Sequence, residues 1–473
     1  TRNRRFWRPV RYQLRHCPTF ASATTAPRPA DCKRSADNCL ARGLPQTCKT
    51  PASLTKMVEV WHSCPVSKTL KHRASARLSA IAPSATLAID SKSKALKASG
   101  EPVINFAPGE PDFPTPEPIV QAALAATADP ANHKYTPAAG LLALREAIAA
   151  SVGDFGDAPL SPADIIVTNG GKQAVYMACA AVIDPGEEVL LPAPYWTSYP
   201  ETIGLAGGIP VPVVAGLDTD YKVTVPQLEA ARTDKTVAMI LCSPSNPTGA
   251  VYSPAELKAI GKWAVDKGIW IISDEIYDKL TYDGATSEPV WRVYPEVANQ
   301  TLVVNGVAKS YSMTGWRVGW LFGPPDVMKV ARALQSHLCS NVNNIAQMAA
   351  LEALTGDQEP VEEMRRAFDR RRKLVLEMLG EIEDLETPTP QGAFYVYPSV
   401  SGLIGKTIAG RKITSSADLA DVILEEAKVG VVPGEAFGTP GYIRLAYAVS
   451  DEDIVEGIER LQKLLGPETS SVS

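Results

Sequence analysis

A series of short apolar segments, alternating with stretches of helical pattern, limits the folds open to this chain. The segments are almost continuously apolar, which is typical of strands buried on both faces of a sheet. One connecting helix begins with a capping box, in which Ser253 is the N-cap, Pro254 the first helical residue and Glu256 the reciprocal partner. Strands alternating with helices predict an α/β fold, with a mostly parallel central sheet and helices on both faces. The segments lie at residues 164–168, 188–191, 237–242, 269–272, 301–304 and 318–322.

The pattern changes after Asn344, which predicts a second, smaller α+β domain. The chain has 473 residues, and one hydrophobic core rarely serves so many. In this part we expect helices and strands at 360–382, 392–397, 430–433, 442–447 and 451–465. We divide the chain into an N-terminal extension at 1–75, an arm and part of the small domain at 76–115, a large domain at 116–335, the rest of the small domain at 336–467, and a tail at 468–473.

The N-terminal extension has a composition of its own. Up to Lys56, Arg and Lys are frequent, the only acidic residues are Asp31 and Asp37, and Ser, Thr, Ala and Pro are common. Such a basic, hydroxyl-rich and acid-poor segment is typical of an organelle transit peptide; the alternative is a disordered extension without an address. The segment lacks the apolar core of a signal peptide, so secretion is the least favoured destination.

Charge, hydropathy and cysteine usage argue against several classes of function. The net charge of -5 gives no electrostatic reason to bind nucleic acid or an anionic membrane. No apolar run approaches the ~18 residues of a membrane helix, so we expect a soluble protein. Most of the eight cysteines precede residue 65, which indicates reduced thiols rather than a disulfide framework. The spacings of a zinc site are missing, and we expect no metal.

Polar residues and a glycine turn follow the apolar segments. Asn246, Asp274 and Lys309 lie at or near the carboxyl ends of predicted strands, and the turn Gly170-Gly171 follows another strand. In open α/β sheets, ligands bind in the crevice beyond those ends. Segments far apart in the chain are thus predicted to build one site. The turn lacks the G-x-G-x-x-G spacing of a dinucleotide site.

Four sequence motifs, in the family's order, resemble the class I aminotransferases that depend on pyridoxal 5'-phosphate (PLP). The resemblance covers residues 78–467. It implies the fold-type I architecture of that family, a homodimer with shared active sites, PLP as cofactor, and amino acids and 2-oxo acids as small-molecule substrates. The motifs are SPSNPTG at 243–249, SDEIY at 273–277, NGVAKS at 305–310 with MTGWRVG at 313–319, and IRLAY at 443–447.

The predicted catalytic residues are Lys309, Asp274 and Tyr277. Lys309 matches the lysine that binds PLP; an aldehyde needs an amine that is deprotonated near neutral pH, and the freed amine can then carry the substrate's Cα proton. A surface lysine is the competing interpretation, which the apolar strand before Lys309 and Arg317 after it disfavour. Asp274 matches the carboxylate that keeps the pyridine nitrogen protonated, and Tyr277 and Asn246 match donors to the phenolic oxygen.

The resemblance also implies a phosphate site. Gly171 and Lys172 begin a helix directly after a strand, where free backbone N–H groups and the helix dipole favour an anion. Arg317 matches the family's phosphate arginine, and Tyr135 matches a tyrosine that reaches the phosphate of the neighbouring subunit. Many relatives carry a serine three residues before the lysine, where this chain has Gly306. One phosphate hydrogen bond is therefore expected from elsewhere.

Further matches concern the substrate. Trp196 is expected to stack on the cofactor ring and to border the substrate; the alternative is an ordinary core aromatic. Arg444 matches the arginine that binds the substrate α-carboxylate, and a buried arginine without an anion costs several kcal/mol. Gly109 lets the backbone approach the same carboxylate, which Asn246 shares.

Lys172 and Thr86 resemble residues that hold a second substrate carboxylate in the bacterial-type (1β) aspartate aminotransferases. That subgroup includes plastid and bacterial enzymes that also accept prephenate. An ammonium and a hydroxyl suit a mobile carboxylate. The competing interpretations are a solvated lysine, which would oppose the helix dipole, and an N-cap or turn hydroxyl for Thr86.

From this subgroup we predict transamination between aspartate or glutamate and 2-oxo acids, and from prephenate to arogenate. The alternative is the same chemistry with an alanine, aromatic or kynurenine side-chain preference, followed by a PLP-dependent lyase or a PLP-fold regulator. By analogy with arogenate synthesis, we expect the transit peptide to lead to the plastid, with the mitochondrion or the cytoplasm as alternatives.

Overall fold

The computed structural model describes residues 74–466. The predicted transit peptide, apart from its last two residues, and the predicted tail at 468–473 lie outside the described residues. The same holds for the five cysteines that precede residue 65.

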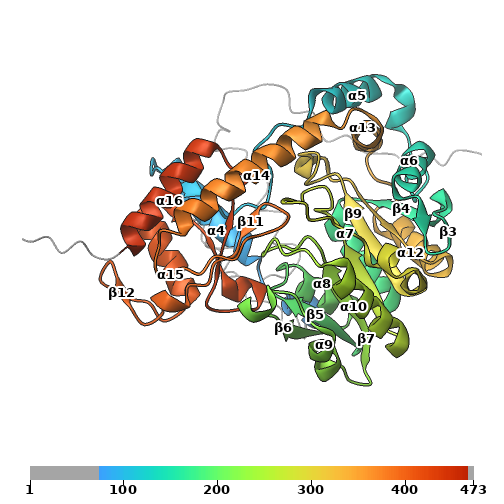
Figure 1. Ribbon diagram of the computed structural model, residues 1–473. Coiled ribbons are helices and arrows are strands. Elements are labelled where there is room, and N and C mark those ends of the chain that lie inside the picture. Colours follow the sequence, from blue (N-terminus) through green and yellow to red (C-terminus); the bar gives the residue numbers. More distant parts are fainter. Residues whose placement is uncertain (1–73, 467–473) are drawn as a thin grey trace, which may run out of the picture. The chain divides into compact units, whose positions relative to one another are not determined.

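A seven-stranded sheet forms the centre of the larger part (Figure 1). Its spatial order is β4-β10-β9-β8-β7-β5-β6. All neighbouring strands are parallel except β10, which runs antiparallel to β4 and β9. The predicted α/β fold with a mostly parallel sheet is therefore confirmed. The strands are β4 (Ile165–Thr168), β5 (Glu188–Ala193), β6 (Ile209–Val214), β7 (Thr236–Cys242), β8 (Trp270–Asp274), β9 (Thr301–Gly306) and β10 (Gly319–Phe322).

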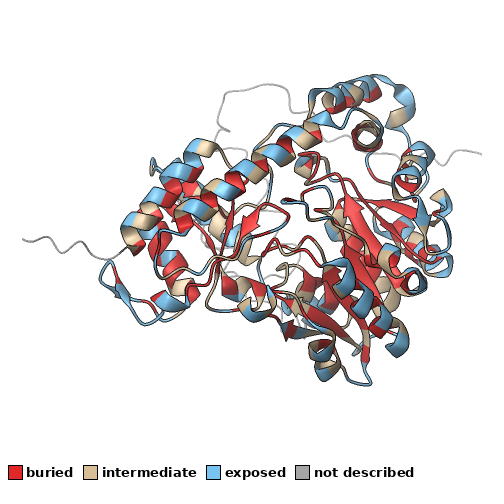
Figure 2. Ribbon diagram, in the orientation of Figure 1, coloured by how far each residue is buried: buried red, intermediate tan, exposed pale blue. Residues whose placement is uncertain are grey.

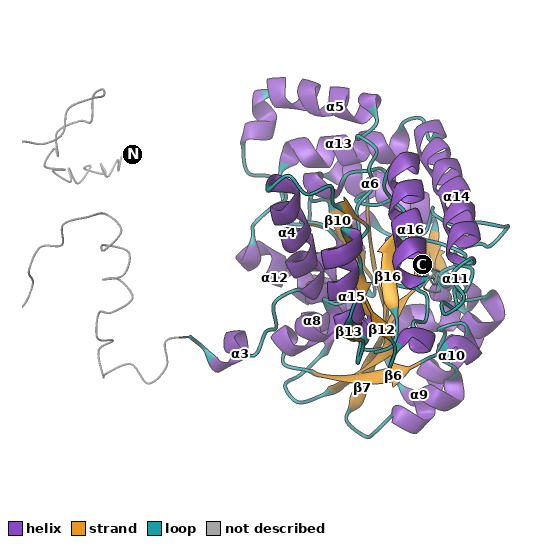
Figure 3. Ribbon diagram, turned by 90° about the vertical axis from the view of Figure 1, so that its left-hand side faces the viewer, coloured by secondary structure: helices purple, strands orange, loops and turns teal. Residues whose placement is uncertain are grey.

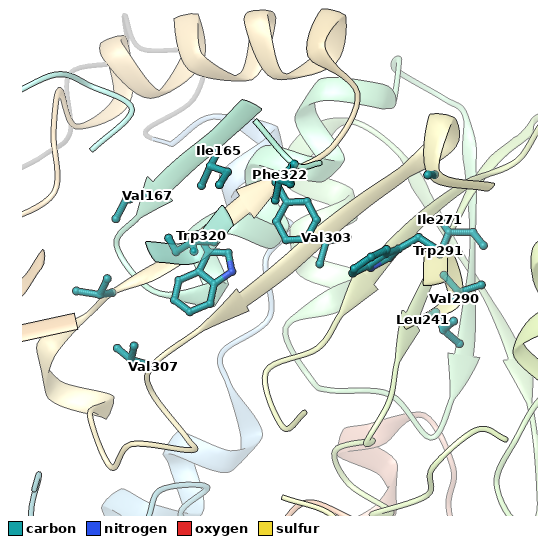
Figure 4. Close-up of a cluster of buried hydrophobic side chains, with 14 of the residues drawn as sticks. Ile165, Val167, Leu241, Ile271, Val290, Trp291, Val303, Val307, Trp320 and Phe322 are labelled. Carbon is teal, nitrogen blue, oxygen red and sulfur yellow. The ribbon is translucent and has the colours of Figure 1, made fainter. Parts of the chain in front are cut away.

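Most residues of the strands are apolar and buried, because helices cover both faces of the sheet (Figure 2). Side chains alternate along β4, so Ile165 and Val167 join one core while Ile166 joins the other (Figure 4). The first core is closed by α5 (Glu117–Ala128), α6 (Leu142–Val152), α9 (Val225–Ala231), α10 (Pro254–Lys267), α11 (Val290–Val293) and α13 (Asn344–Thr355). The second is closed by α7 (Gly171–Val182), α8 (Tyr199–Ala206) and α12 (Pro325–Leu338).

A separate hydrophobic core lies under a small three-stranded sheet with the order β11-β16-β15. Helices α14 and α16 lie side by side over it (Figures 1 and 3). The early strand β1 pairs in parallel with the late strand β14, so both ends of the described chain meet in this part. The elements are α4 (Ala85–Ala98), β1 (Ile104–Asn105), α14 (Glu359–Leu379), β11 (Tyr395–Val396), α15 (Ser416–Val422), β14 (Val429–Gly430), β15 (Val432–Pro433), β16 (Ile443–Ala446) and α16 (Asp451–Leu465).

Some predicted elements differ in extent. The strand expected at 392–397 is reduced to β11, because Ala393 has a left-handed backbone with a φ of 57° that interrupts the extended chain. The strand expected at 430–433 is divided between β14 and β15. The capping box of α10 is present, with Glu256 bonded back to Ser253. The remaining short elements are α3 (Ala76–Ser79), β2 (Asp154–Phe155), β3 (Ala158–Pro159), β12 (Thr407–Ile408) and β13 (Arg411–Lys412).

Two further properties concern residues 74–466 only. Within this range, no helix combines the length and the hydropathy that a membrane crossing requires. The same part of the chain contains no group of His, Cys, Asp and Glu side chains that could hold a metal ion. Its three cysteines, Cys179, Cys242 and Cys339, are free.

Candidate active site

A cavity of about 440 Å³ collects groups from both sheets, a volume typical of small-molecule sites. The strands β7, β8 and β9 reach it with their carboxyl ends, and β16 reaches it with one face. Of the predicted site residues, all but Tyr135 line it. They are Thr86, Gly109, Gly171, Lys172, Trp196, Asn246, Asp274, Tyr277, Lys309, Arg317 and Arg444.

Lys309 follows β9, and its ammonium donates a hydrogen bond to the carbonyl of Gly109. Burial lowers the pKa of Lys309 to about 8, and the positive charges of Arg444 and Arg317 act in the same direction. The negative charge of Glu110 opposes them. A lysine with this pKa holds a substantial neutral fraction near neutral pH and can act as a nucleophile toward a carbonyl.

Asp274 is the last residue of β8 and is only 5% exposed. Burial raises its pKa to about 6, although the hydroxyl of Tyr199 donates to it at 2.7 Å. A buried carboxylate with such a pKa gains from a cationic N–H partner, because that partner compensates its desolvation.

Four polar side chains form a connected group at the junction of the two sheets. The Nη1 of Arg444 donates to the Oδ1 of Asn246 at 3.0 Å. The hydroxyl of Tyr277 lies 2.8 Å from that of Tyr395. Arg444 is 2% exposed, and its guanidinium lies between the rings of Tyr395 and Phe437, at 4.7 and 5.0 Å from their centroids. Its Nε has no hydrogen-bond partner among the described residues.

The positive end of α7 lies beside an arginine. Arg317 donates to the carbonyls of Thr314 and Asn169, and its guanidinium lies against Gly170. Gly170 has a φ of +81°, a backbone conformation that residues other than glycine rarely adopt, and a Cβ there would also clash with the end of the Arg317 side chain. The free N–H groups at Gly171 and the arginine together suit an anion such as a phosphate.

Lys172, Trp196 and Thr86 border another side of the cavity. The Nζ of Lys172 lies 5.1 Å from the centroid of the Trp196 indole. Burial and the neighbouring Arg317 lower the pKa of Lys172. Thr86 lies in the first turn of α4, where Ser84 is the N-cap, so the competing cap role belongs to the serine. The two hydroxyls are 2.9 Å apart.

Two further positions from the sequence analysis are Tyr135, which is exposed, and Gly306, which is tightly packed. Tyr135 is 90% exposed and does not line the cavity of this chain. A Cβ at Gly306 would come within 2.9 Å of the backbone of Gly319 and Val318 on the adjacent strand. The close approach of β9 and β10 therefore explains why this chain has a glycine, not a serine, three residues before Lys309.

Several cavity residues were not predicted. Tyr199 and Tyr395 are buried tyrosines that contact Asp274 and Tyr277, and Glu110 lies at the mouth, where Thr314 donates to it at 2.9 Å. A local signal existed for Glu110, which directly follows Gly109. The tyrosines belong to aromatic-rich segments in which local sequence does not distinguish packing from function.

Comparison with known proteins identifies the family. Residues 101–461 match the model of the family described as "Aminotransferase class I and II". An aspartate aminotransferase of Streptomyces avermitilis is 58% identical over 395 residues, which cover 84% of this chain and 97% of that protein. An aspartate/prephenate aminotransferase of Cereibacter sphaeroides is 45% identical over 387 residues, covering 81% and 96%.

Solved structures agree. The aspartate aminotransferase of Rhizobium meliloti superposes with a TM-score of 0.80 at 37% identity, covering 83% of this chain and 99% of that one. The aspartate aminotransferase of Thermus thermophilus with maleate gives a TM-score of 0.78 at 38% identity, covering 83% and 100%.

Proposed function

This chain belongs to the class I and II aminotransferase family, and we propose that it transfers amino groups between aspartate or glutamate and 2-oxo acids, with prephenate as a further acceptor that yields arogenate. One observation carries the substrate proposal: the buried Arg444 and the ammonium of Lys172 line the same cavity. Two cations suit a substrate with two carboxylates. The similar Thermus protein is described with maleate, which is a dicarboxylate.

The cavity fits PLP by the chemistry of its donors. Lys309 has a lowered pKa, Asp274 is a buried carboxylate with a raised pKa, and Gly170 leaves room for Arg317 beside the start of α7. We propose that these residues bind the aldehyde, the pyridine nitrogen and the phosphate, respectively. When bound, PLP supplies an electron-accepting ring, which amino-group transfer requires.

The side chains then divide the work of the reaction. With PLP bound, the neutral amine of Lys309 would accept the substrate's Cα proton and deliver it to the cofactor. Asp274 would keep a proton on the ring nitrogen, and Tyr277 and Asn246 would donate to the phenolic oxygen. Trp196 covers the ring and excludes water.

Substrate binding uses the opposite side of the cavity. Arg444 pairs with the α-carboxylate, which also completes the hydrogen bonds of its Nε. Gly109 and Asn246 contact the same carboxylate. Lys172 and Thr86 hold the distal carboxylate of aspartate, glutamate or prephenate.

We further propose a homodimer in which Tyr135 reaches the phosphate of the partner's site. This proposal is supported by its 90% exposure and by its position outside the cavity of its own chain. Mixing Tyr135→Ala chains with Lys309→Ala chains should restore activity, because some hybrid sites contain neither change. Hybrids that stay inactive while each parent is folded and dimeric would contradict a shared site.

For the chain as a whole, we propose large and small domains with boundaries near residues 116 and 336, and a plastid address within residues 1–75. The address is supported by the basic, acid-poor composition of that segment. Residues 1–75 fused to a fluorescent protein should enter plastids; import into mitochondria, or retention in the cytoplasm, would contradict the proposal.

The substrate proposal is tested by steady-state assays on aspartate, prephenate with an amino donor, alanine and phenylalanine. Aspartate and prephenate should exceed alanine and phenylalanine in kcat/KM by about tenfold or more, since each charge-assisted hydrogen bond to a carboxylate contributes ~1.5–3 kcal/mol. Equal or higher values for alanine or phenylalanine would favour the alternative substrate preference.

A further inference from the structure

Tyr395 faces the cavity from the same side of the small sheet as Arg444. In the register of β11 and β16, Tyr395 lies opposite Ala446, two residues after Arg444, and side chains two residues apart share a face. Tyr395 is completely buried, yet it lines the cavity. Its ring lies 4.7 Å from the guanidinium of Arg444.

The hydroxyl of Tyr395 contacts three segments that are far apart in the chain. It lies 2.8 Å from the hydroxyl of Tyr277 and 3.5 Å from the Nδ2 of Asn246. It also lies against the backbone of Gly109, where a Cβ would come within 2.5 Å of it. One oxygen atom therefore touches the segments that carry two cofactor donors and the glycine beside the substrate carboxylate.

The direction of the hydrogen bond between Asn246 and Tyr395 follows from Arg444. A guanidinium can only donate, so the atom of Asn246 that faces Arg444 is its oxygen. The amide NH2 of Asn246 therefore points to Tyr395, whose oxygen accepts from it. The 2.8 Å contact between Tyr395 and Tyr277 permits donation from either hydroxyl. We assign the donor to Tyr395, which leaves the hydrogen of Tyr277 for the cavity.

We propose that Tyr395 is a positioning residue for the transamination site: its hydroxyl orients Tyr277 as a donor toward the cofactor's phenolic oxygen and sets the position of the Gly109 backbone. The proposal rests on the proposed function, because it assumes that Tyr277 meets PLP. The alternative is a purely structural role, in which Tyr395 only packs its ring into the core.

Tyr395→Phe distinguishes the positioning role from simple packing, because it keeps the ring and removes only the hydroxyl. The absorbance of bound PLP changes when the cofactor loses a proton, and the midpoint is the pH at which half of the bound cofactor has changed. A donor on the phenolic oxygen stabilises the anionic form of the cofactor and therefore lowers this midpoint. Loss of the Tyr395 hydroxyl weakens that donor, so the midpoint should rise by roughly 0.5 pH unit, the size expected for polarisation through one intervening hydrogen bond. An unchanged midpoint would overturn the proposal.

A double-mutant comparison shows whether Tyr395 acts through Tyr277. Tyr277→Phe should itself raise the midpoint, and adding Tyr395→Phe should give no further rise. The same shift in both backgrounds would overturn the proposal. Tyr397→Phe is the matched control. Tyr397 is buried and directly follows β11, its hydroxyl lies 2.7 Å from that of Thr439, and it does not line the cavity. It should leave the midpoint unchanged.

A second variant covers the case in which Tyr395→Phe does not fold, as judged by circular dichroism. Replacing Tyr395 with 3-fluorotyrosine keeps the shape and makes the hydroxyl a stronger donor. The midpoint should then fall, and a rise or no change would overturn the proposal. The proposed function fails in a different way: the unmodified protein would show no cofactor absorbance at all.

Discussion

Two sheets supply side chains to one cavity in different ways. In the seven-stranded sheet, the groups come at or after the strand ends: Asp274 ends β8, Asn246 follows β7 and Lys309 follows β9. In the three-stranded sheet, Arg444 lies inside β16, and its side chain leaves from the face of the sheet. Strand ends are next to loops and free backbone N–H groups, whereas a sheet face belongs to an apolar core.

The difference between the two sheets appears in the surroundings of Arg317 and Arg444. Arg317, beside the large sheet, is exposed and bonds to two backbone carbonyls. Arg444 is buried, and burial lowers its pKa. An uncompensated buried charge costs several kcal/mol. We infer that the small sheet holds its arginine for an anion that arrives with each substrate, while the strand ends of the large sheet suit a resident cofactor.

The largest effect should come from removing the charge on the sheet face. Arg444→Leu should lower kcat/KM by about two hundred- to five thousandfold for every amino acid, because losing one partner of a buried ion pair costs ~3–5 kcal/mol. PLP affinity, measured by absorbance titration, should remain. Arg411→Leu is the control, because it removes an exposed arginine that pairs with Glu425 at 2.6 Å. It should change neither kcat/KM nor the affinity for PLP. A loss of PLP affinity as large as the loss of kcat/KM would contradict the separation of the two sheets.

A smaller and selective effect is expected at the start of α7. Lys172→Ala should lower kcat/KM for aspartate and prephenate by about ten- to a hundredfold, since a charge-assisted hydrogen bond of ~1.5–3 kcal/mol is lost. Alanine, without a distal carboxylate, should be nearly unaffected. Lys258→Ala, an exposed lysine on α10, is the matched control. Equal losses for alanine and aspartate with PLP still bound would assign Lys172 to the cofactor or the fold.

The smallest effect is a pH dependence at the end of β9. Burial disfavours the charged form of Lys309 and lowers its pKa to about 8, so the neutral amine becomes more abundant as pH rises through that value. The rate at which the cofactor-free protein takes up PLP, followed by stopped-flow absorbance, should rise about fivefold from pH 7 to pH 8 and level off above about pH 9.

The charge of Glu110 sharpens this measurement. Because Glu110 raises the pKa of Lys309, Glu110→Gln should move the plateau to lower pH. A rate that keeps rising through pH 10 would mean that the lysine titrates like a solvated one, and the burial argument would be wrong.

The large sheet was predictable from the sequence because its signals are local. Apolar runs such as those ending at Asp274 and before Lys309 mark strands buried on both faces, and the crevice beyond them follows from the topology. The exception is β6, whose Pro210 and Pro212 interrupt the strand pattern. It lies at the edge of the sheet, where a strand tolerates residues that lack an N–H donor.

The small sheet was less predictable because its strands are short and its contacts are tertiary. Arg444 was found through its motif, but Tyr395 was not, since its role depends on the pairing of β11 with β16 and on the approach of Tyr277. The donation from Tyr199 to Asp274 likewise joins residues that are far apart in the sequence.

Lys309 is the residue proposed to join the strand ends of the large sheet to the cofactor. The purified protein should be yellow, and borohydride reduction should attach PLP covalently to one peptide, which contains Lys309. Peptide mapping by mass spectrometry reads the result directly. Attachment to a peptide with Lys172 or any other lysine, or a colourless protein that takes up no PLP, would contradict the account.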